Sequence, residues 1–269
     1  MTLLPSGKAQ PELGTREEVS RTMKASLGPE NTDVVLLCGG RGSRLGPLTE
    51  SIPKPLLTVG QKPFLFYLLL RLRRQGFHRF ILATHYLSEK FKDFLTIYDE
   101  FTPATIVISE KEPLGTGGAL RHAVALVRSP CFVALNGDSF IPQSLLPVLS
   151  SHVRLRTSFT MIAARSENVV GGAENKGFLE IGDGGQIIGL SPRAKSQRWV
   201  NAGVYILDRD MVLSWPEGRY ELETNLMALL GQRKRQVFFS ENRLLDIGTP
   251  ECYAEANQLP GLFALEDIA

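Results

Sequence analysis

Residues 34–45 read Val-Val-Leu-Leu-Cys-Gly-Gly-Arg-Gly-Ser-Arg-Leu, and this run carries more structural information than any other part of the chain. The apolar residues Val34–Leu37 predict a buried strand that ends in a loop. That loop is too rich in glycine for ordinary packing and too basic for an ordinary turn. Its glycines let the backbone approach a ligand or adopt positive φ, and exposed amides beside Arg41 and Arg44 suit phosphate groups. The run therefore predicts an α/β enzyme that handles nucleotides.

Composition narrows the class of protein. A chain of 269 residues with 43% hydrophobic residues suits one large α/β domain. The 30 basic and 28 acidic residues give a net charge of +2, which argues against nucleic acid as the main partner. We find neither an apolar run of transmembrane length nor a signal-peptide core, so we expect a cytoplasmic protein without a membrane partner. Three widely spaced cysteines without metal-site spacing indicate reduced thiols.

Strand and helix signals alternate from Asp33 onward, which predicts parallel strands with helices on both faces. We expect a Rossmann-like, doubly wound mixed sheet in a single domain. A flexible extension (1–31) precedes a folded domain (32–259), and a tail (260–269) follows it. The domain divides into a nucleotide-binding half (32–150) and a second half of mixed α+β character (151–259).

The expected elements place the candidate site. Strands are predicted over 34–37, 79–84, 105–109 and 131–135, and then over 157–164, 178–181, 186–190, 200–207, 237–240 and 243–246. Helices are predicted over 64–75, 88–100, 118–127, 221–230 and 250–258. Ligands of such sheets bind at the carboxyl ends of the strands. The glycine loop, Asp138 and Asp246 all fall at predicted strand ends.

The glycine loop fits neither of the two commonest nucleotide fingerprints. A Walker A loop needs Gly-Lys-Ser/Thr at its end, and a dinucleotide loop needs a third glycine where this chain has Leu45. The nearest lysine is Lys54, which two prolines flank in Ile-Pro-Lys-Pro-Leu (52–56). Fixed backbone on both sides suggests a positioned cation rather than a solvated turn lysine.

Two acidic residues at strand ends form a second candidate functional group of residues. Asp138 lies in Asn-Gly-Asp-Ser (136–139), and Asp246 lies in Leu-Leu-Asp-Ile-Gly-Thr-Pro (244–250). A single acid in such a place is more often a helix cap than a ligand. Two of them beside a phosphate loop favour a magnesium site, because Mg²⁺ prefers carboxylate oxygens next to substrate phosphates.

A second glycine cluster occupies residues 110–119, Glu-Lys-Glu-Pro-Leu-Gly-Thr-Gly-Gly-Ala. It is either a loop entering a helix or a place where the backbone approaches a flat ligand such as a nucleobase. In the second case, a carboxylate such as that of Glu112 accepts hydrogen bonds from two donors on guanine.

Six motifs together resemble the sugar-1-phosphate nucleotidylyltransferases: 37–45, 53–55, 112–119, 136–138, 201–203 and 246–250 occur in that family's order. The resemblance covers about Asp33 to Asn257. Within the family, the runs 110–119 and 246–251 look most like D-glycero-α-D-manno-heptose 1-phosphate guanylyltransferases. Mannose-1-phosphate guanylyltransferases and N-acetylmuramate-1-phosphate uridylyltransferases are close cousins.

The resemblance implies a role for each motif. Arg44, Lys54 and Asp138 would be catalytic, with Arg44 on the leaving pyrophosphate and Lys54 on phosphate oxygens. Asp138 and Asp246 would hold Mg²⁺. The nucleotide would be bound by Leu37, Gly39, Gly40, Gly42, Ser43, Glu112, Gly115, Thr116 and Gly117. The second half would bind the sugar through Gly177 and Asn201.

One departure from the family concerns the acceptor sugar. Relatives commonly show Phe-x-Glu-Lys before the Asn-Ala-Gly strand, and that lysine contacts the sugar phosphate. Here the region reads Leu-Ser-Pro-Arg-Ala-Lys (190–195), so Arg193 or Lys195 must substitute.

The expected reaction joins the nucleoside monophosphate of a nucleoside triphosphate, GTP in preference, to a sugar 1-phosphate. Heptose 1-phosphate is favoured over mannose 1-phosphate, and the nucleotide-sugar would serve surface polysaccharide synthesis. Alternatives are a uridylyltransferase of the same family, a glycosyltransferase, and a non-catalytic nucleotide-sugar-binding homologue. The glycosyltransferase is disfavoured because Asp138 lacks a second Asp two residues away. Assembly into a homo-oligomer stays open.

Overall fold

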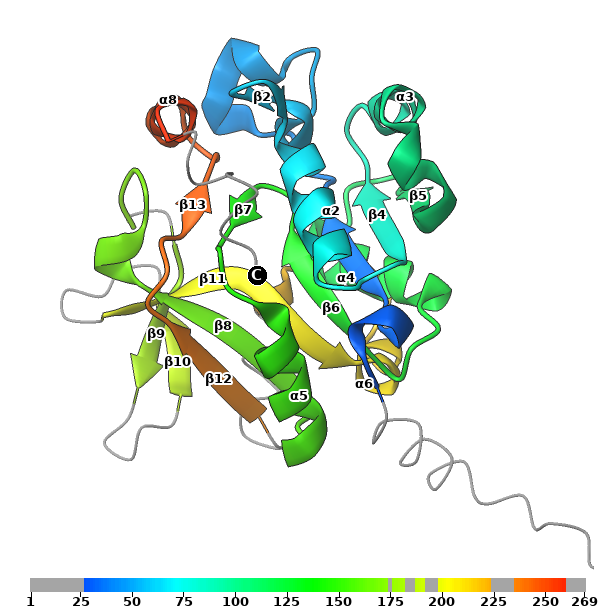
Figure 1. The fold of residues 1–269 in the computed structure, drawn as a ribbon, viewed down its shortest axis with the longest axis vertical. Helices are drawn as coiled ribbons and strands as arrows, with labels where there is room; N and C mark the ends of the chain where they lie inside the picture. Colours follow the sequence, from blue (N-terminus) through cyan, green and yellow to red (C-terminus); the bar gives the residue numbers. More distant parts are fainter. Residues whose placement is uncertain (1–26, 174–175, 182–186, 192–197, 224–234, 260–269) are drawn as a thin grey trace, which may run out of the picture.

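The computed structural model describes residues 27–173, 176–181, 187–191, 198–223 and 235–259 (Figure 1). Its main strands are β1 (Val34–Leu37), β4 (Phe80–Thr84), β5 (Thr105–Ser109), β6 (Cys131–Asn136), β8 (Phe159–Arg165), β9 (Phe178–Ile181), β10 (Ile187–Ser191), β11 (Trp199–Asp208) and β12 (Arg235–Ser240). The helices are α2 (Phe64–Arg74), α3 (Glu89–Ile97), α4 (Gly115–Ala123), α5 (Leu145–Leu155), α6 (Arg209–Leu213) and α8 (Pro250–Asn257).

One sheet of nine strands runs through both halves of the domain. Its parallel part has the order β6-β1-β4-β5, so that β1 pairs with β6 on one side and β4 on the other. This order reverses direction between β1 and β6, which makes their carboxyl ends the crevice where doubly wound sheets bind ligands. The antiparallel strand β11 continues the sheet from β6, and β8 and β9 both pair with β11. The predicted doubly wound mixed sheet is confirmed.

Alternation of apolar residues along the strands places a helical layer on each face of the sheet. In β1, Val34 and Leu36 pack in the core that contains residues of α2, α3 and α5. Val35 points to the opposite face, where it joins residues of α4 and α6. Both cores therefore hold the β1 carboxyl end, and the glycine loop that follows it, in a fixed position.

Two short ladders lie outside the main sheet. β2 (Thr58–Val59) pairs with β3 (Lys62–Pro63), and β7 (Ser139–Phe140) pairs with β13 (Leu245–Asp246). The second ladder matters for the site, because it joins a segment just after β6 to one near the end of the domain. Figure 1 shows β7 and β13 next to each other below α8.

The structure differs from the sequence-based elements in several places. Helix α5 has no predicted counterpart, because Pro147 and two serines obscured its apolar periodicity; proline is tolerated this early in a helix. The helix predicted over 88–100 ends earlier, at Ile97, and Ser88 directly precedes it with its hydroxyl bonded to that of Thr84 at 2.7 Å. Most of the predicted helix 221–230 lies outside the described residues.

The start of the domain also differs. Residues 27–31 were assigned to the flexible extension, but Leu27 packs against the core and Thr32 donates a hydrogen bond to the carbonyl of Gly28 at 2.7 Å. The folded domain therefore begins at least five residues earlier than the predicted boundary at residue 32. Residues 1–26 and the tail 260–269 lie outside the described residues.

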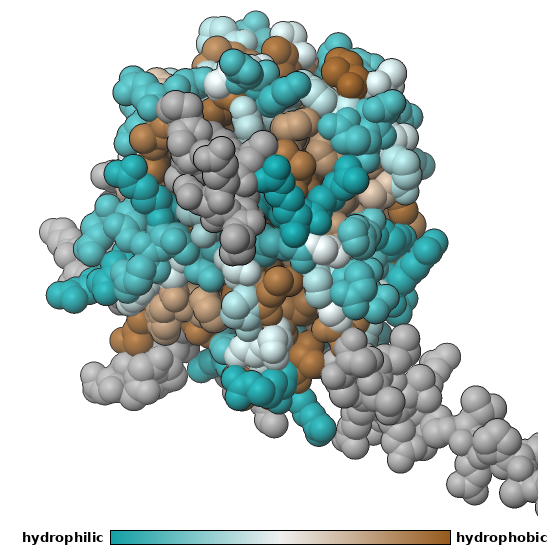
Figure 2. All heavy atoms as spheres, viewed as in Figure 1, coloured by the Kyte–Doolittle hydropathy of each residue, from teal (hydrophilic) through white to brown (hydrophobic). Residues whose placement is uncertain are grey.

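The described surface is mainly polar on the face shown in Figure 2, where hydrophobic residues form small separate groups. Within the described ranges, we find no helix that is both long and apolar enough to cross a bilayer.

The close contact between α4 and the segment 218–221 gives a test of the fold. A Cβ on Gly118 would lie 2.1 Å from the carbonyl oxygen of Gly218, a backbone atom that cannot easily move away. We expect Gly118→Ala to lower the free energy of unfolding by about 1–3 kcal/mol, the usual cost of overpacking. Urea denaturation measures it. Gly40→Ala is the matched control, because a Cβ there meets nothing within 4 Å. Equal stability of the two variants would contradict this packing.

Candidate functional site

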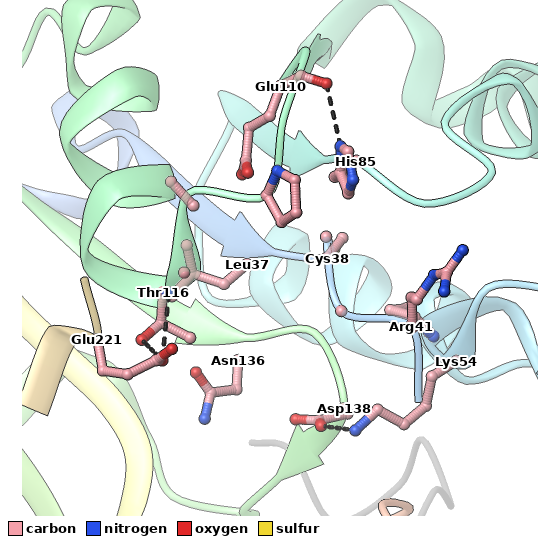
Figure 3. Close-up of a pocket in the computed structure, with 16 residues that line it drawn as sticks. Leu37, Cys38, Arg41, Lys54, His85, Glu110, Thr116, Asn136, Asp138 and Glu221 are labelled. Atoms are coloured by element: carbon pink, nitrogen blue, oxygen red, sulfur yellow. Dashed lines mark hydrogen bonds and ion pairs between the residues drawn. The ribbon is translucent and has the colours of Figure 1, made fainter. Parts of the chain in front are cut away.

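A cavity of about 570 Å³ opens at the carboxyl ends of β1 and β6 (Figure 3). Its size falls within the range of small-molecule and cofactor sites. The lining residues come from the glycine loop, the segment around Lys54, the ends of β4, β5 and β6, the start of α4 and Glu221: Leu37, Cys38, Gly39, Gly40, Arg41, Lys54, Pro55, His85, Glu110, Pro113, Gly115, Thr116, Ala119, Asn136, Asp138 and Glu221.

The structure brings most of the predicted nucleotide loop to this cavity. Leu37, Gly39 and Gly40 line it, whereas Gly42 and Ser43 do not. Gly42 has φ of 66°, and its carbonyl accepts a hydrogen bond from the Thr49 hydroxyl at 3.0 Å. Gly42 therefore shapes the turn, while Gly40 leaves open space beside the cavity.

The second glycine cluster is explained mainly by protein packing. The amides of Gly117 and Gly118 donate to the carbonyl of Tyr220 at 3.0 and 3.3 Å, and a Cβ on Gly117 would lie 2.4 Å from the Tyr220 ring. Gly115 and Thr116 line the cavity, but Gly117 is buried beneath Tyr220 and does not. Packing against Tyr220 is thus sufficient to explain glycine at 117, which agrees with a loop that enters a helix, the first of the two interpretations.

A buried carboxylate faces the cavity, but it is not the predicted one. Glu112 is exposed and absent from the lining, whereas Glu110 lines the cavity and is buried. One Glu110 carboxylate oxygen accepts a hydrogen bond from the Leu114 amide at 2.9 Å, and the other has no partner among the described residues. Burial raises the pKa of Glu110 above its ordinary value, although the Leu114 amide opposes the shift. The sequence did contain a signal for this residue, because Glu110 directly follows β5 and ligands of such sheets bind at the carboxyl ends of the strands.

Sequence reasoning also missed Glu221. Its carboxylate accepts from the Thr116 hydroxyl at 2.9 Å, and that hydroxyl oxygen accepts from the Leu222 amide at 2.8 Å. The cavity is therefore closed on this side by a segment from the second half of the domain. We find no signal in the sequence that links residues 116 and 221.

The two predicted metal-binding acids lie close together. In the β7–β13 ladder Asp246 pairs with Ser139, and the Ile247 amide donates to the Asp138 carbonyl at 3.1 Å. Each acid also has a lysine: Lys54 forms an ion pair with Asp138, and Lys176 forms one with Asp246. Lys176 was not predicted.

These lysines determine the charge state of Asp138. Burial alone would raise the pKa of Asp138, but the ammonium groups of Lys54 and Lys176 outweigh it and hold that pKa below the ordinary value. Asp138 is therefore an ionised carboxylate at neutral pH. In Figure 3 the Lys54–Asp138 pair lies at the opposite end of the cavity from Glu110 and His85.

Arg44 and two of the predicted sugar-binding residues, Gly177 and Asn201, lie outside the lining of the cavity. A Cβ on Gly248 would lie 3.2 Å from an Arg44 guanidinium nitrogen, so Arg44 lies beside the segment that follows β13. The carbonyl of Gly177 accepts from the Asn201 amide at 2.8 Å. The Asn201 side chain is buried and bonded to the Gly203 amide at 2.9 Å and the Tyr205 hydroxyl at 2.5 Å.

Arg193 and Lys195, the two candidates for the missing family lysine, lie outside the described residues.

The donor set fits a magnesium ion in kind. Asp138 and Asp246 supply hard carboxylate oxygens from adjoining segments, and at least Asp138 is held ionised. The described residues contain no cluster of three or more His, Cys, Asp or Glu side chains. A magnesium ion here would therefore need phosphate oxygens and water to complete its coordination, which is how Mg²⁺ usually binds in phosphoryl-transfer sites.

Comparison with known proteins agrees with this geometry. The sequence profile of the family described as Nucleotidyl transferase matches residues 33–260. The D-glycero-alpha-D-manno-heptose 1-phosphate guanylyltransferase of Campylobacter jejuni is 32% identical over 222 residues, which span 81% of this chain and 96% of that protein. The mannose-1-phosphate guanylyltransferase of Mycobacterium tuberculosis is 27% identical over 237 residues, or 86% of this chain and 65% of that protein.

A solved structure agrees with the sequence relatives. HddC from Yersinia pseudotuberculosis, crystallised in complex with GMP-PN, superposes with a TM-score of 0.73 at 28% identity and covers 84% of this chain and 98% of its own. Fold, motifs and relatives point to one group. The chain belongs to the nucleotidyl transferase family, among its sugar-1-phosphate nucleotidylyltransferases.

Proposed function

We propose that the protein transfers guanosine monophosphate from GTP to a sugar 1-phosphate and releases pyrophosphate. D-glycero-α-D-manno-heptose 1-phosphate is the favoured acceptor, and mannose 1-phosphate is the second. The proposal for the base depends above all on Glu110, a residue of the cavity lining whose buried carboxylate has one oxygen without a hydrogen-bond partner among the described residues. The proposal for the sugar follows the heptose 1-phosphate guanylyltransferase that shares 32% identity with this chain.

The chemistry of guanine explains why a buried carboxylate supports this base. Guanine presents two adjacent N–H donors on one edge, whereas uracil and cytosine present only one donor next to an acceptor. A carboxylate only accepts hydrogen bonds when ionised. In Glu110 one oxygen accepts from the Leu114 amide, and the other has no partner among the described residues, so it can still accept a hydrogen bond. A donor-rich edge therefore fits, and an acceptor facing this oxygen would be repelled.

The reaction itself is an in-line displacement. An oxygen of the sugar 1-phosphate attacks the α-phosphorus of GTP, the new P–O bond forms, and the bond to the β-phosphate oxygen breaks as pyrophosphate leaves. The acceptor is already an anion, so no side-chain nucleophile is required. The protein's task is to hold two anions in line and to offset their repulsion.

The charged residues of the site have distinct tasks in this displacement. Lys54 stabilises negative charge on the phosphate oxygens, and Arg44 is assigned to the leaving pyrophosphate. The backbone amides near Gly39 and Gly40 cradle phosphates. Asp138 and Asp246 would hold a magnesium ion, which supplies neutralisation of phosphate charge.

A substrate panel tests the function directly. Purified protein is incubated with Mg²⁺, each of GTP, UTP, CTP and dTTP, and each of heptose 1-phosphate, mannose 1-phosphate, glucose 1-phosphate and N-acetylmuramate 1-phosphate. Pyrophosphate release is recorded. We expect the largest kcat/KM with GTP and heptose 1-phosphate. Preference for UTP would overturn the guanylyl assignment, and a silent panel with nucleotide-sugar binding would favour the non-catalytic homologue.

Glu110→Gln tests how the base is read. The carbonyl oxygen of the glutamine can still accept the hydrogen bond from the Leu114 amide. The NH₂ group of the glutamine then takes the place of the second carboxylate oxygen, so a donor replaces an acceptor. We expect kcat/KM for GTP to fall at least about tenfold, because hydrogen bonds to a charged group contribute about 1.5–3 kcal/mol. Activity with UTP should fall less or rise. Glu112→Gln is the matched control and should leave both values unchanged. A similar loss in both variants would contradict the assignment.

The same residue predicts a pH effect. The pKa of Glu110 is raised by burial, so the carboxyl gains its proton at a higher pH than a free glutamate does. As pH falls through this raised pKa, the protein loses its acceptor for guanine and KM for GTP should increase. Glu110→Gln cannot titrate, so its KM for GTP should lack this acid limb. The phosphates of GTP titrate in the same way with both proteins. The ratio of KM for GTP in the wild type to that in Glu110→Gln, followed as a function of pH, therefore reports the titration of Glu110 alone.

Gly40→Ala tests whether the loop serves a ligand. The protein itself leaves room for a Cβ at this position, which has ordinary φ. Stability should therefore be unchanged. A methyl group would block close approach of phosphates to the backbone, so KM for GTP should rise about tenfold, a loss of about 1.4 kcal/mol in binding. Unchanged KM would show that the loop does not contact the nucleotide closely.

A further inference from the structure

The pair formed by Lys176 and Asp246 has no role in the reaction as described so far. Lys176 lies two residues before β9, and its side chain is only 9% exposed. Its ammonium bonds one carboxylate oxygen of Asp246, while the other oxygen accepts from the Gly248 amide at 2.6 Å. Both oxygens of a proposed metal ligand are therefore occupied by the protein itself.

This pair is part of a four-charge cluster. The β7–β13 ladder places Asp246 opposite Ser139, the residue after Asp138, and Asp138 pairs with Lys54. Lys176 also acts on Asp138, because its charge contributes to the lowered pKa of that acid. Two carboxylates and two ammonium groups thus balance each other.

A divalent ion would disturb this balance in a defined way. Mg²⁺ needs the same carboxylate oxygens that the lysines contact, and two cations cannot share one oxygen closely without strong repulsion. A lysine displaced from Asp246 would remain largely buried, and a buried charge is costly without a partner. An incoming phosphate group would supply the missing anion.

The position of Lys176 indicates which phosphate that is. Lys54 lies beside the nucleotide loop, since a Cβ on Gly42 would lie 3.3 Å from the Cβ of Lys54. Lys176 instead continues into Gly177, whose carbonyl binds the Asn201 amide of β11 at 2.8 Å. Lys176 therefore belongs to the second half of the domain, on the side assigned to the acceptor.

We propose that Lys176 binds the phosphate of the sugar 1-phosphate, and that a metal ion at Asp246 releases it for this purpose. In the free protein Lys176 neutralises Asp246 in place of the metal. This inference rests on the proposed function. It makes Lys176 a candidate for binding the acceptor, in addition to Arg193 and Lys195. If the ion pair were purely structural, its removal would instead lower the stability of the protein and change KM for both substrates alike.

The first test measures metal binding without substrates. Mn²⁺ is titrated into the free protein, and the unbound ion is followed by electron paramagnetic resonance. Lys176→Met keeps the length of the side chain and removes the competing charge, so we expect severalfold tighter Mn²⁺ binding than in the wild type. Lys176→Arg keeps the charge and should bind Mn²⁺ like the wild type. If Lys176→Met binds Mn²⁺ with unchanged or lower affinity, a metal ion does not displace Lys176 from Asp246 and the proposal is overturned.

The second test separates the two substrates. With saturating GTP, KM for the sugar 1-phosphate should rise about tenfold or more in Lys176→Met, since one charge-assisted bond is lost. KM for GTP should change far less, and Lys176→Arg should recover part of the loss. Lys92→Met, an exposed lysine on α3, is the matched control and should change neither value. Equal increases in both KM values would overturn the assignment to the acceptor.

The outcomes also separate this inference from the proposed function. If the wild type turns over no sugar 1-phosphate, the proposed function fails. If the wild type is active and Lys176→Met keeps both its metal affinity and its KM for the acceptor, only the role of Lys176 fails. Thermal unfolding of each variant shows that the comparison is made between folded proteins; should Lys176→Met not fold, Lys176→Gln replaces it with the same expected results.

Discussion

The site depends on mutual neutralisation of charge at the end of the sheet. A protein that binds two phosphorylated substrates must keep cations in a cavity, and one that binds a magnesium ion must keep carboxylates there. Unpaired buried charges are costly, so each needs a partner while the substrates are absent. The ion pairs Lys54–Asp138 and Lys176–Asp246 meet both needs at once. They also explain how two acids of like charge remain close together, with the pKa of Asp138 lowered rather than raised.

The fold supplies this arrangement through two kinds of strand pairing. Parallel pairing of β1 with β6 brings the glycine loop beside Asp138, at the point where the strand order reverses. The short antiparallel β7–β13 ladder then adds Asp246 from the last part of the domain. The contact of Tyr220 with the amides of Gly117 and Gly118 closes the other side. Each half thus contributes one lysine–aspartate pair, and neither half contains the whole site.

Local signals in the sequence predicted the strands, the glycine loop and the two acids, because a strand that ends in glycine or aspartate is visible without knowledge of the fold. Contacts between distant segments were not visible. Lys176 has no motif of its own, and only the tertiary structure shows its partner. Glycine at 117 and 118 correctly indicated a close approach, but the sequence could not show that the approaching groups belong to the protein itself, the Tyr220 ring at 117 and the Gly218 carbonyl at 118. The sequence also could not show that Glu112 is exposed while Glu110 lines the cavity, because the direction of a side chain after a strand depends on how the turn is made.

Competition for the same carboxylates has a thermodynamic consequence. If the lysines must leave the acids before a metal ion binds, and if phosphates then take the lysines, binding of metal and of phosphate must favour each other. Linkage makes this coupling reciprocal, so the metal tightens phosphate binding by the factor by which phosphate tightens metal binding. A site of this kind assembles its full positive charge only when substrates arrive. The lysine–aspartate pairing is then compatible with metal binding rather than an obstacle to it.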